Sequence, residues 1–86
     1  MSGAAPGVAL SELAAGNGGK IAALELPPEA RQRLLEMGMT VGARIEVVRY
    51  APLGDPVDIK VRGYHLSIRK HEAAGIRVVD EKGERT

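Results

Sequence analysis

The feature that most constrains this chain is a short amphipathic helix that is stopped by glycine and followed by tightly turned strands. Ala30, Leu34 and Met37 are spaced i, i+4, i+7, which lays one apolar stripe along a helix. Gly38 is placed to end that helix in a left-handed conformation. A turn rich in proline and glycine at 51–56 (Ala-Pro-Leu-Gly-Asp-Pro) then separates two strands. This order is typical of a small β-barrel, whose narrow interior leaves function to the surface.

Period-two alternation of apolar and polar residues predicts strands that bury one face and wet the other. The segment Arg62-Gly63-Tyr64 between two such runs is too short for anything but a tight turn, so the two strands form a hairpin. The predicted strands cover 20–26, 43–48, 57–62, 64–69 and 76–79. The residues expected to point inward are Ile21, Leu24, Ala43, Ile45, Val47, Val57, Ile59, Val61, Tyr64, Leu66, Ile68, Ile76 and Val78.

The remaining segments complete the predicted architecture. Residues 8–13 fit a short strand that runs into a helical turn, and 70–74 fit one helical turn closed by Gly75. We therefore expect a mainly β fold, a small SH3-like antiparallel β-barrel with one inserted amphipathic α-helix and a short helical turn. A flexible start at 1–7 precedes the domain at 8–80, and a charged tail at 81–86 follows it.

Composition excludes several classes of protein. The 86 residues make one domain, and the lack of cysteine excludes disulfides and thiolate metal sites. Twelve basic against eleven acidic residues argue against a nucleic-acid binder, and two tyrosines without Phe or Trp provide no platform for stacking bases. With neither a bilayer-spanning run nor a signal peptide, we expect a soluble intracellular domain that does not insert in membranes.

The residues capable of catalysis do not form a recognisable site. Ser67 lies between His65 and Arg69 on one predicted strand face, but a nucleophile also needs an oriented base and an oxyanion hole. We see no source of either in the sequence. The chain is therefore predicted not to be an enzyme.

Metal binding is the stronger chemical candidate. The plausible ligands are the imidazole and carboxylate groups of His65, His71, Glu72 and Asp58, which would suit iron(II) or zinc. The two histidines are six residues apart, however, a spacing that fits no helix pair and no strand pair. Two solvated surface histidines are the alternative. We expect no required cofactor, and any Fe2+ or Zn2+ to be weak or adventitious.

A protein-binding surface is expected near the end of the helix. Leu35, Met37 and Met39 gather there, and Leu53 lies at the tip of the 51–56 turn, more apolar side chains than so small a barrel readily buries. The alternative is that the Met37 side closes one end of the barrel. Basic residues could add a patch for an acidic partner, although a solvated face is the default. Those on the helix are Arg31 and Arg33.

The order and spacing of these motifs resemble the FeoA family, over roughly Leu10 to Val79. Each motif alone is weak, but the combination is specific. One departure is Val41, where the family often has proline; valine keeps the backbone extended, so the fold is not in doubt. The matching segments are Gly19-Lys20-Ile21, Arg33 to Gly42, Ile45-Glu46-Val47, Ala51 to Pro56, Val61 to Tyr64, Leu66 to Arg69 and Glu72 to Val78.

The resemblance implies a cytoplasmic, non-enzymatic accessory protein of bacterial ferrous iron uptake. Such a protein would bind the cytoplasmic part of the transporter FeoB at the inner face of the membrane and tune its nucleotide-driven gating. Self-association stays open. The alternative is an iron(II)-binding or metal-sensing SH3-like module related to the C-terminal domain of DtxR-type repressors. Those repressors carry it behind a helix-turn-helix region that 86 residues cannot hold.

Overall fold

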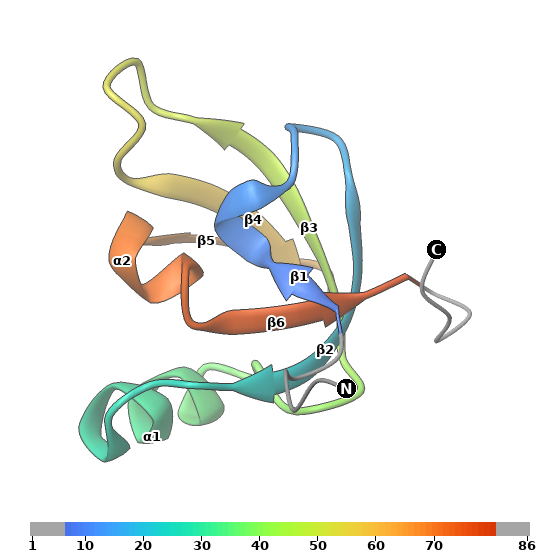
Figure 1. Ribbon diagram of the computed structural model, residues 1–86, viewed down its shortest axis with the longest axis vertical. Coiled ribbons are helices and arrows are strands. Elements are labelled where there is room, and N and C mark those ends of the chain that lie inside the picture. The colour runs from blue at the N-terminus through green and yellow to red at the C-terminus, as the bar shows by residue number, and fades with distance from the viewer. Residues whose placement is uncertain (1–6, 81–86) are drawn as a thin grey trace, which may run out of the picture.

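Six strands form one curved antiparallel sheet in the computed structural model, which describes residues 7–80 (Figure 1). The strand order is β1-β6-β2-β3-β4-β5, so β1 and β5 are the edges. The predicted flexible start, apart from Gly7, and the predicted charged tail lie outside the described residues. The elements are β1 (Val8–Ala9), the 3-10 helix η1 (Leu10–Glu12), β2 (Gly18–Leu24), α1 (Pro28–Glu36), β3 (Arg44–Tyr50), β4 (Val57–Val61), β5 (Tyr64–Ile68), α2 (Lys70–Ala73) and β6 (Ile76–Val79).

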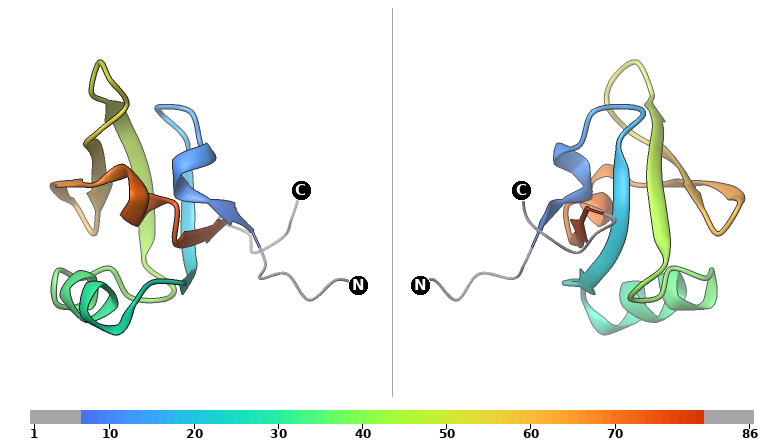
Figure 2. Two further views of the ribbon diagram at one scale, coloured as in Figure 1. Left: turned by 60° about the vertical axis from the view of Figure 1, so that its left-hand side comes forward. Right: turned by 90° about the vertical axis from the view of Figure 1, so that its right-hand side faces the viewer.

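The core inside the sheet is aliphatic, as the sequence predicts. Val57, Ile59 and Val61 of β4 are fully buried, and they alternate with the more exposed Asp58 and Lys60. Figure 2 shows the sheet curling round on itself. The buried apolar residues of the cluster are Leu10, Ile21, Leu24, Leu34, Met39, Ala43, Ile45, Val47, Val57, Ile59, Val61, Ile68, Ala73, Ile76 and Val78.

The prediction that Tyr64 points into the core is wrong. Its side chain is 68% exposed, and Leu66 on the same strand is only half-buried. The physical reason is position: Tyr64 directly follows the hairpin turn on the edge strand β5, so no further strand of the described chain covers it.

The β4–β5 hairpin itself is confirmed, with a two-residue turn. Val61 pairs with Tyr64, and the turn residues Arg62 and Gly63 have φ of 53° and 85°. Positive φ at both positions is the type I′ geometry that matches the twist of a hairpin. Arg62 donates from Nε to the Gly38 carbonyl at 3.0 Å, and this bond ties the hairpin tip to the end of α1.

The helix α1 begins at a proline and ends at the predicted glycine stop. Pro28 occupies its first turn, where a missing N–H costs no helical hydrogen bond. At the other end Gly38, with φ of 93°, donates to the Leu35 carbonyl, and the Met39 N–H donates to the Leu34 carbonyl, both at 3.0 Å. This pair of bonds is the Schellman motif, in which the residue after the glycine turns back against the helix.

Tyr50 fastens the N-terminal segment to β3. Its hydroxyl donates to the Leu13 carbonyl at 2.5 Å and lies 3.3 Å from the Ser11 carbonyl. Burial raises the pKa of the Tyr50 phenol. The segment 8–13 is therefore held in place as a strand and one helical turn, as predicted. Within residues 7–80, no helix is long and apolar enough to cross a membrane.

Candidate functional site

The predicted apolar cluster at the end of the helix divides into buried and exposed members. Met39 is fully buried, so the expectation that it lies on a partner surface is wrong. It follows Gly38 in the Schellman motif, which directs it into the core. Leu35 and Met37 are half-buried and pack against the core, whereas Leu53 is 94% exposed.

Leu53 lies at the tip of a well-braced loop between β3 and β4. The Gly54 N–H donates to the Ala51 carbonyl at 2.7 Å, and the Ala51 N–H donates to the Pro56 carbonyl at 3.1 Å. Asp55 accepts a hydrogen bond from the backbone N–H of Lys70 at 3.1 Å. Figure 1 shows this loop standing clear of the sheet. These hydrogen bonds therefore order the loop and hold Leu53 in a solvent-exposed position.

A shallow groove of about 510 Å³ lies between β2 and α1 and brings together two predicted partner residues, Arg31 and Leu35. It also includes Val41, 65% exposed, which the sequence reading treated only as a family departure. The sequence signal that could have indicated this exposure is the position of Val41 in the turn after Met39, where an apolar side chain has no neighbouring strand to pack against. The groove residues are Ala22, Ala23, Leu24, Arg31, Gln32, Leu35 and Val41.

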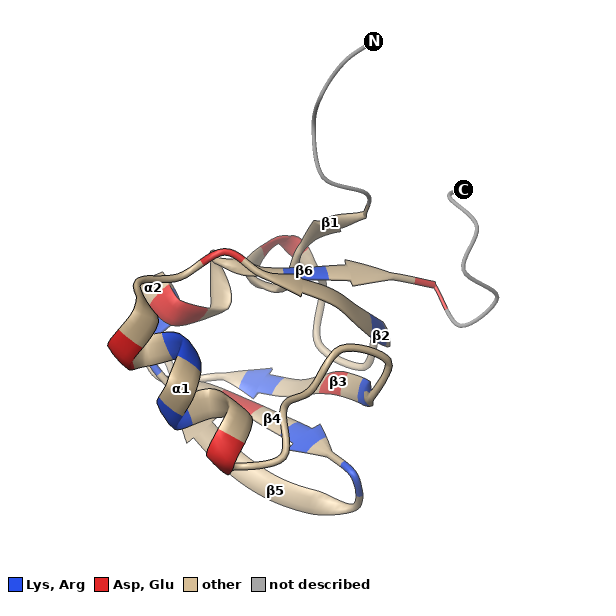
Figure 3. Cartoon of the chain, turned by 90° about the horizontal axis from the view of Figure 1, so that it is seen from below, with Lys and Arg blue, Asp and Glu red and all other residues tan. Residues whose placement is uncertain are grey.

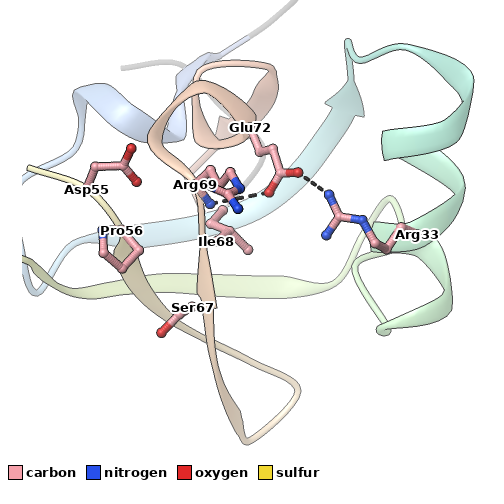
Figure 4. A pocket seen from close by; sticks show the side chains of 7 residues that line it. All are labelled: Arg33, Asp55, Pro56, Ser67, Ile68, Arg69 and Glu72. Atoms are coloured by element: carbon pink, nitrogen blue, oxygen red, sulfur yellow. Dashed lines mark hydrogen bonds and ion pairs between the residues drawn. The ribbon is translucent and has the colours of Figure 1, made fainter.

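Arg33 makes an ion pair that the sequence does not predict. It forms an ion pair through Nη2 with Glu72, which is buried, while the Arg33 side chain is 53% exposed (Figure 4). The other Glu72 oxygen, Oε1, accepts from the backbone N–H of Arg69 at 3.3 Å. Arg33 thus joins α1 to α2 and is only partly available to a partner. A pocket of about 440 Å³ lies beside this pair, lined by Arg33, Asp55, Pro56, Ser67, Ile68, Arg69 and Glu72.

Replacing Arg33 by alanine is expected to lower the free energy of unfolding by about 2 kcal/mol. Removing one partner of a fully buried ion pair costs roughly 3–5 kcal/mol, and water reaching the exposed side of this pair reduces that cost. Chemical denaturation measures the change. The exposed Arg31 on the same helix is the matched control, with R31A expected within about 0.5 kcal/mol of the parent. Recovery of part of the loss in R33A/E72Q would support the ion pair, and an unchanged R33A would contradict it.

The three predicted metal ligands are not brought together. His65 lies on β5 and His71 on α2, and the Glu72 carboxylate is bonded to Arg33 and Arg69. Within residues 7–80, no three side chains of histidine, aspartate or glutamate are grouped so that they could hold a metal ion. Asp58, the fourth candidate, is bonded to its own neighbours.

Asp58 belongs to a polar network on the outer face of β3, β4 and β5. Its Oδ1 accepts from the Ser67 hydroxyl at 2.7 Å, and its Oδ2 accepts from Arg49 Nε at 2.9 Å. The hydrogen bond from Ser67, followed by the bond and charge of Arg49, holds the pKa of the Asp58 carboxyl below its usual value. Together with His65, these three side chains line a shallow pocket of about 350 Å³. The Asp58 carboxylate that accepts from the Ser67 hydroxyl is a weak base because its pKa is lowered, so it activates Ser67 poorly as a nucleophile.

The Ser67→Ala variant is expected to raise the pKa of Asp58 toward its usual value, because the largest cause of the depression is removed. A carboxyl with a lowered folded-state pKa stabilises the fold above its unfolded pKa, and this is lost as pH falls through the folded pKa. Acid unfolding of S67A should therefore depend less on pH over that interval. An NMR titration of the carboxyl measures the pKa directly. The same pKa in S67A as in the parent would contradict the role of the hydroxyl.

Charges of both signs are interleaved over the surface. In Figure 3, acidic segments lie at the two ends of α1 with basic segments between them, and acidic and basic segments neighbour each other on β3. This distribution agrees with the near-balance of twelve basic and eleven acidic residues. The apolar features, Leu53 and the groove beside α1, are therefore the more distinctive parts of the described surface.

Comparison with known proteins identifies the family. A family model described as the FeoA domain matches residues 8–80. An Fe(2+) transport protein A/Fe(2+) transporter FeoB fusion protein of Porphyromonas gingivalis is 44% identical over 69 residues. This match covers 80% of the present chain and only 8% of the fusion protein.

Solved structures agree in fold. The solution structure of a FeoA protein from Chlorobium tepidum has a TM-score of 0.78 and 38% identity, covering 84% of this chain and 70% of that chain. The crystal structure of Stenotrophomonas maltophilia FeoA complexed with zinc, described as a procaryotic SH3 domain protein, has a TM-score of 0.70 and 26% identity. It covers 81% of this chain and 87% of that one. The predicted SH3-like fold is thus confirmed, and the chain belongs to the FeoA family of non-catalytic accessory proteins in ferrous iron transport.

Proposed function

We propose that this chain docks on the cytoplasmic part of a FeoB transporter and thereby tunes its nucleotide-driven gating. The observation that carries the proposal is the relative in which Fe(2+) transport protein A and FeoB form one polypeptide. A fused domain meets its partner at a high effective concentration, whereas a separate chain needs a docking surface of its own. This chain would act in the cytoplasm, at the inner face of the membrane.

Leu53 is the residue that we assign to that docking surface. It is the most exposed of the large hydrophobic side chains of the described chain, and its loop is braced by bonds at the base. An apolar side chain on a pre-ordered loop loses little conformational entropy on binding, so more of its burial energy appears as affinity. It would fill a pocket on the transporter.

The groove between β2 and α1 is the alternative docking surface. It combines the half-buried Leu35 and the exposed Val41 with Arg31 at its margin, an apolar patch next to a cation. This surface would bind an apolar segment that carries an acidic residue. The groove and the Leu53 loop can be altered separately, so variants decide between them.

The proposal is tested by calorimetric titration of the chain into the purified cytoplasmic domain of its cognate FeoB. We expect saturable binding with a stoichiometry of one chain per domain. Nucleotide hydrolysis by the FeoB domain, measured with and without the chain, reports whether binding changes its activity. Absence of saturable binding in every nucleotide state would overturn the proposal.

The metal-sensing alternative has weaker support. The Stenotrophomonas maltophilia relative was solved with zinc, but the histidines and the glutamate predicted here to bind metal are not grouped within residues 7–80. Glu72 is already paired with Arg33. We therefore propose that the chain needs no resident cofactor, and that ferrous iron is the cargo of the transporter that it regulates.

A further inference from the structure

The outer edge of β5 carries backbone groups that the described fold leaves without partners. In a hairpin with a two-residue turn, the residues that flank the turn form a hydrogen-bonded pair, and such pairs then alternate along the strands. Val61 and Tyr64 flank this turn, so Leu66 and Ile68 also bond to β4. The N–H and C=O groups of His65 and Ser67 therefore point away from β4. Outside the strand pairing, no backbone–backbone hydrogen bond within residues 7–80 involves His65 or Ser67.

The free edge is sharply limited on both sides. Toward the turn, Gly63 has a φ of 85° and is not extended. Toward α2, the Arg69 N–H donates to Glu72, and its carbonyl accepts from the N–H groups of Glu72 and Ala73 at 3.0 Å. His65 and Ser67 are thus the only residues of this edge that can bond to an added strand.

This edge lacks three of the usual protections against pairing. β5 contains no proline and no lysine, and its pairing with β4 has no bulge. Such devices normally prevent edge strands from pairing with other chains. Figure 2 (right) shows the β4–β5 hairpin standing out from the body of the sheet, where another chain can approach it.

We propose that β5 is a self-association edge, at which β5 of a second copy pairs antiparallel about a twofold axis at Leu66. In this register His65 of each copy lies opposite Ser67 of the other, and each of these two pairs exchanges two backbone hydrogen bonds. All the free groups of the edge are then used. The sheet continues from one copy into the next.

The side chains favour this register over its neighbours. Tyr64 lies opposite Ile68, Leu66 opposite Leu66, and Arg69 opposite Gly63, so no like charges face each other. The pairing also covers Tyr64, which is 68% exposed, and Leu66, which is half-buried. If the second copy is shifted by two residues in one direction, His65 lies opposite Arg69, whose backbone groups are already hydrogen-bonded. If it is shifted by two residues in the other direction, the His65 residues of the two copies lie opposite each other, and Ser67 would have to pair with the turn residue Gly63.

Sedimentation velocity from micromolar to millimolar concentration tests the proposal. We expect a monomer–dimer equilibrium that Ser67→Pro and His65→Pro each weaken roughly tenfold or more, because each removes two hydrogen bonds across the twofold axis. The proline removes an N–H that has no partner in the monomer, so the single chain keeps its backbone hydrogen bonds. Ser67→Pro also loses the hydroxyl bond to Asp58, and Ser67→Ala loses it equally. Ser67→Ala and His65→Ala are the matched controls; they retain the N–H and should dimerise like the parent.

A second measurement does not depend on the proline variants folding. In a sample mixing isotope-labelled and unlabelled chains, an intermolecular NOE between the Hα atoms of Leu66 in the two copies is expected, since residues of a non-hydrogen-bonded pair lie close together. A monomer at every concentration, or a dimer that lacks this NOE or resists both prolines, would overturn the proposal. So would a monomeric chain whose FeoB affinity falls in the proline variants, because the edge would then receive a transporter strand. The sedimentation and NOE measurements do not require FeoB docking to be correct.

Discussion

Leu53→Asp is expected to weaken binding to the FeoB cytoplasmic domain tenfold or more while leaving the free energy of unfolding unchanged. Leu53 is 94% exposed, so the folded chain loses almost no packing when the side chain changes. At an interface the same side chain would enter an apolar pocket, where a central anchor typically contributes about 2 kcal/mol or more. Calorimetric titration measures the affinity, and chemical denaturation measures the stability.

Two controls make the result specific. Leu53→Met keeps an apolar side chain of similar volume and should bind within a few-fold of the parent. Val41→Asp places the same new charge in the groove beside α1. If V41D weakens binding and L53D does not, the docking surface lies in the groove. If neither variant changes the affinity, both proposed surfaces are wrong.

Local rules account for the parts of the fold that the sequence predicts. Val57, Ile59 and Val61 are buried because a two-residue period follows directly from strand geometry. The helix ends at Gly38 because glycine accepts a positive φ at little cost. The turn at 62–63 follows from the short distance between two alternating runs. Each of these features depends on residues close together in the chain.

Contacts between distant residues account for what the sequence did not predict. Arg33 and Glu72 are 39 positions apart, and no local pattern indicates that a helix arginine meets a buried carboxylate of α2. The pairing of β1 with β6 likewise joins the two ends of the described chain. Tyr64 continues an apolar alternation, but its exposure depends on the strand order that places β5 at an edge.

Backbone hydrogen bonds also decide which residues of the candidate surface can contact a partner. Leu35, Met37, Met39 and Leu53 look alike in a composition argument, because all four are apolar and lie at the end of a helix or in a turn. The backbone separates them: the Schellman motif directs Met39 inward, while bonds across the base of the 51–56 loop hold Leu53 outward. A docking residue in so small a domain is therefore identified by backbone hydrogen bonds more than by its side chain.

Met39→Ala is expected to lower the free energy of unfolding by about 2–5 kcal/mol, the range for truncating a fully buried methionine. Met39 is fully buried in the core cluster that also contains Leu34, so the truncation leaves a cavity within the core. Met37→Ala is the matched control, and its half-buried side chain should cost clearly less. Chemical denaturation of both variants measures the difference, and equal losses would contradict the assignment of Met39 to the core.

The binding behaviour of M39A separates the two roles of apolar residues at this end of the helix. Under conditions in which M39A remains folded, its affinity for the FeoB domain should equal that of the parent, because a core side chain touches no partner. Loss of affinity in the fully folded variant would mean that Met39 supports the docking surface from beneath. L53D should show the opposite pattern, with stability retained and affinity lost. Only a domain that keeps its core and its docking residue in separate places would give both results.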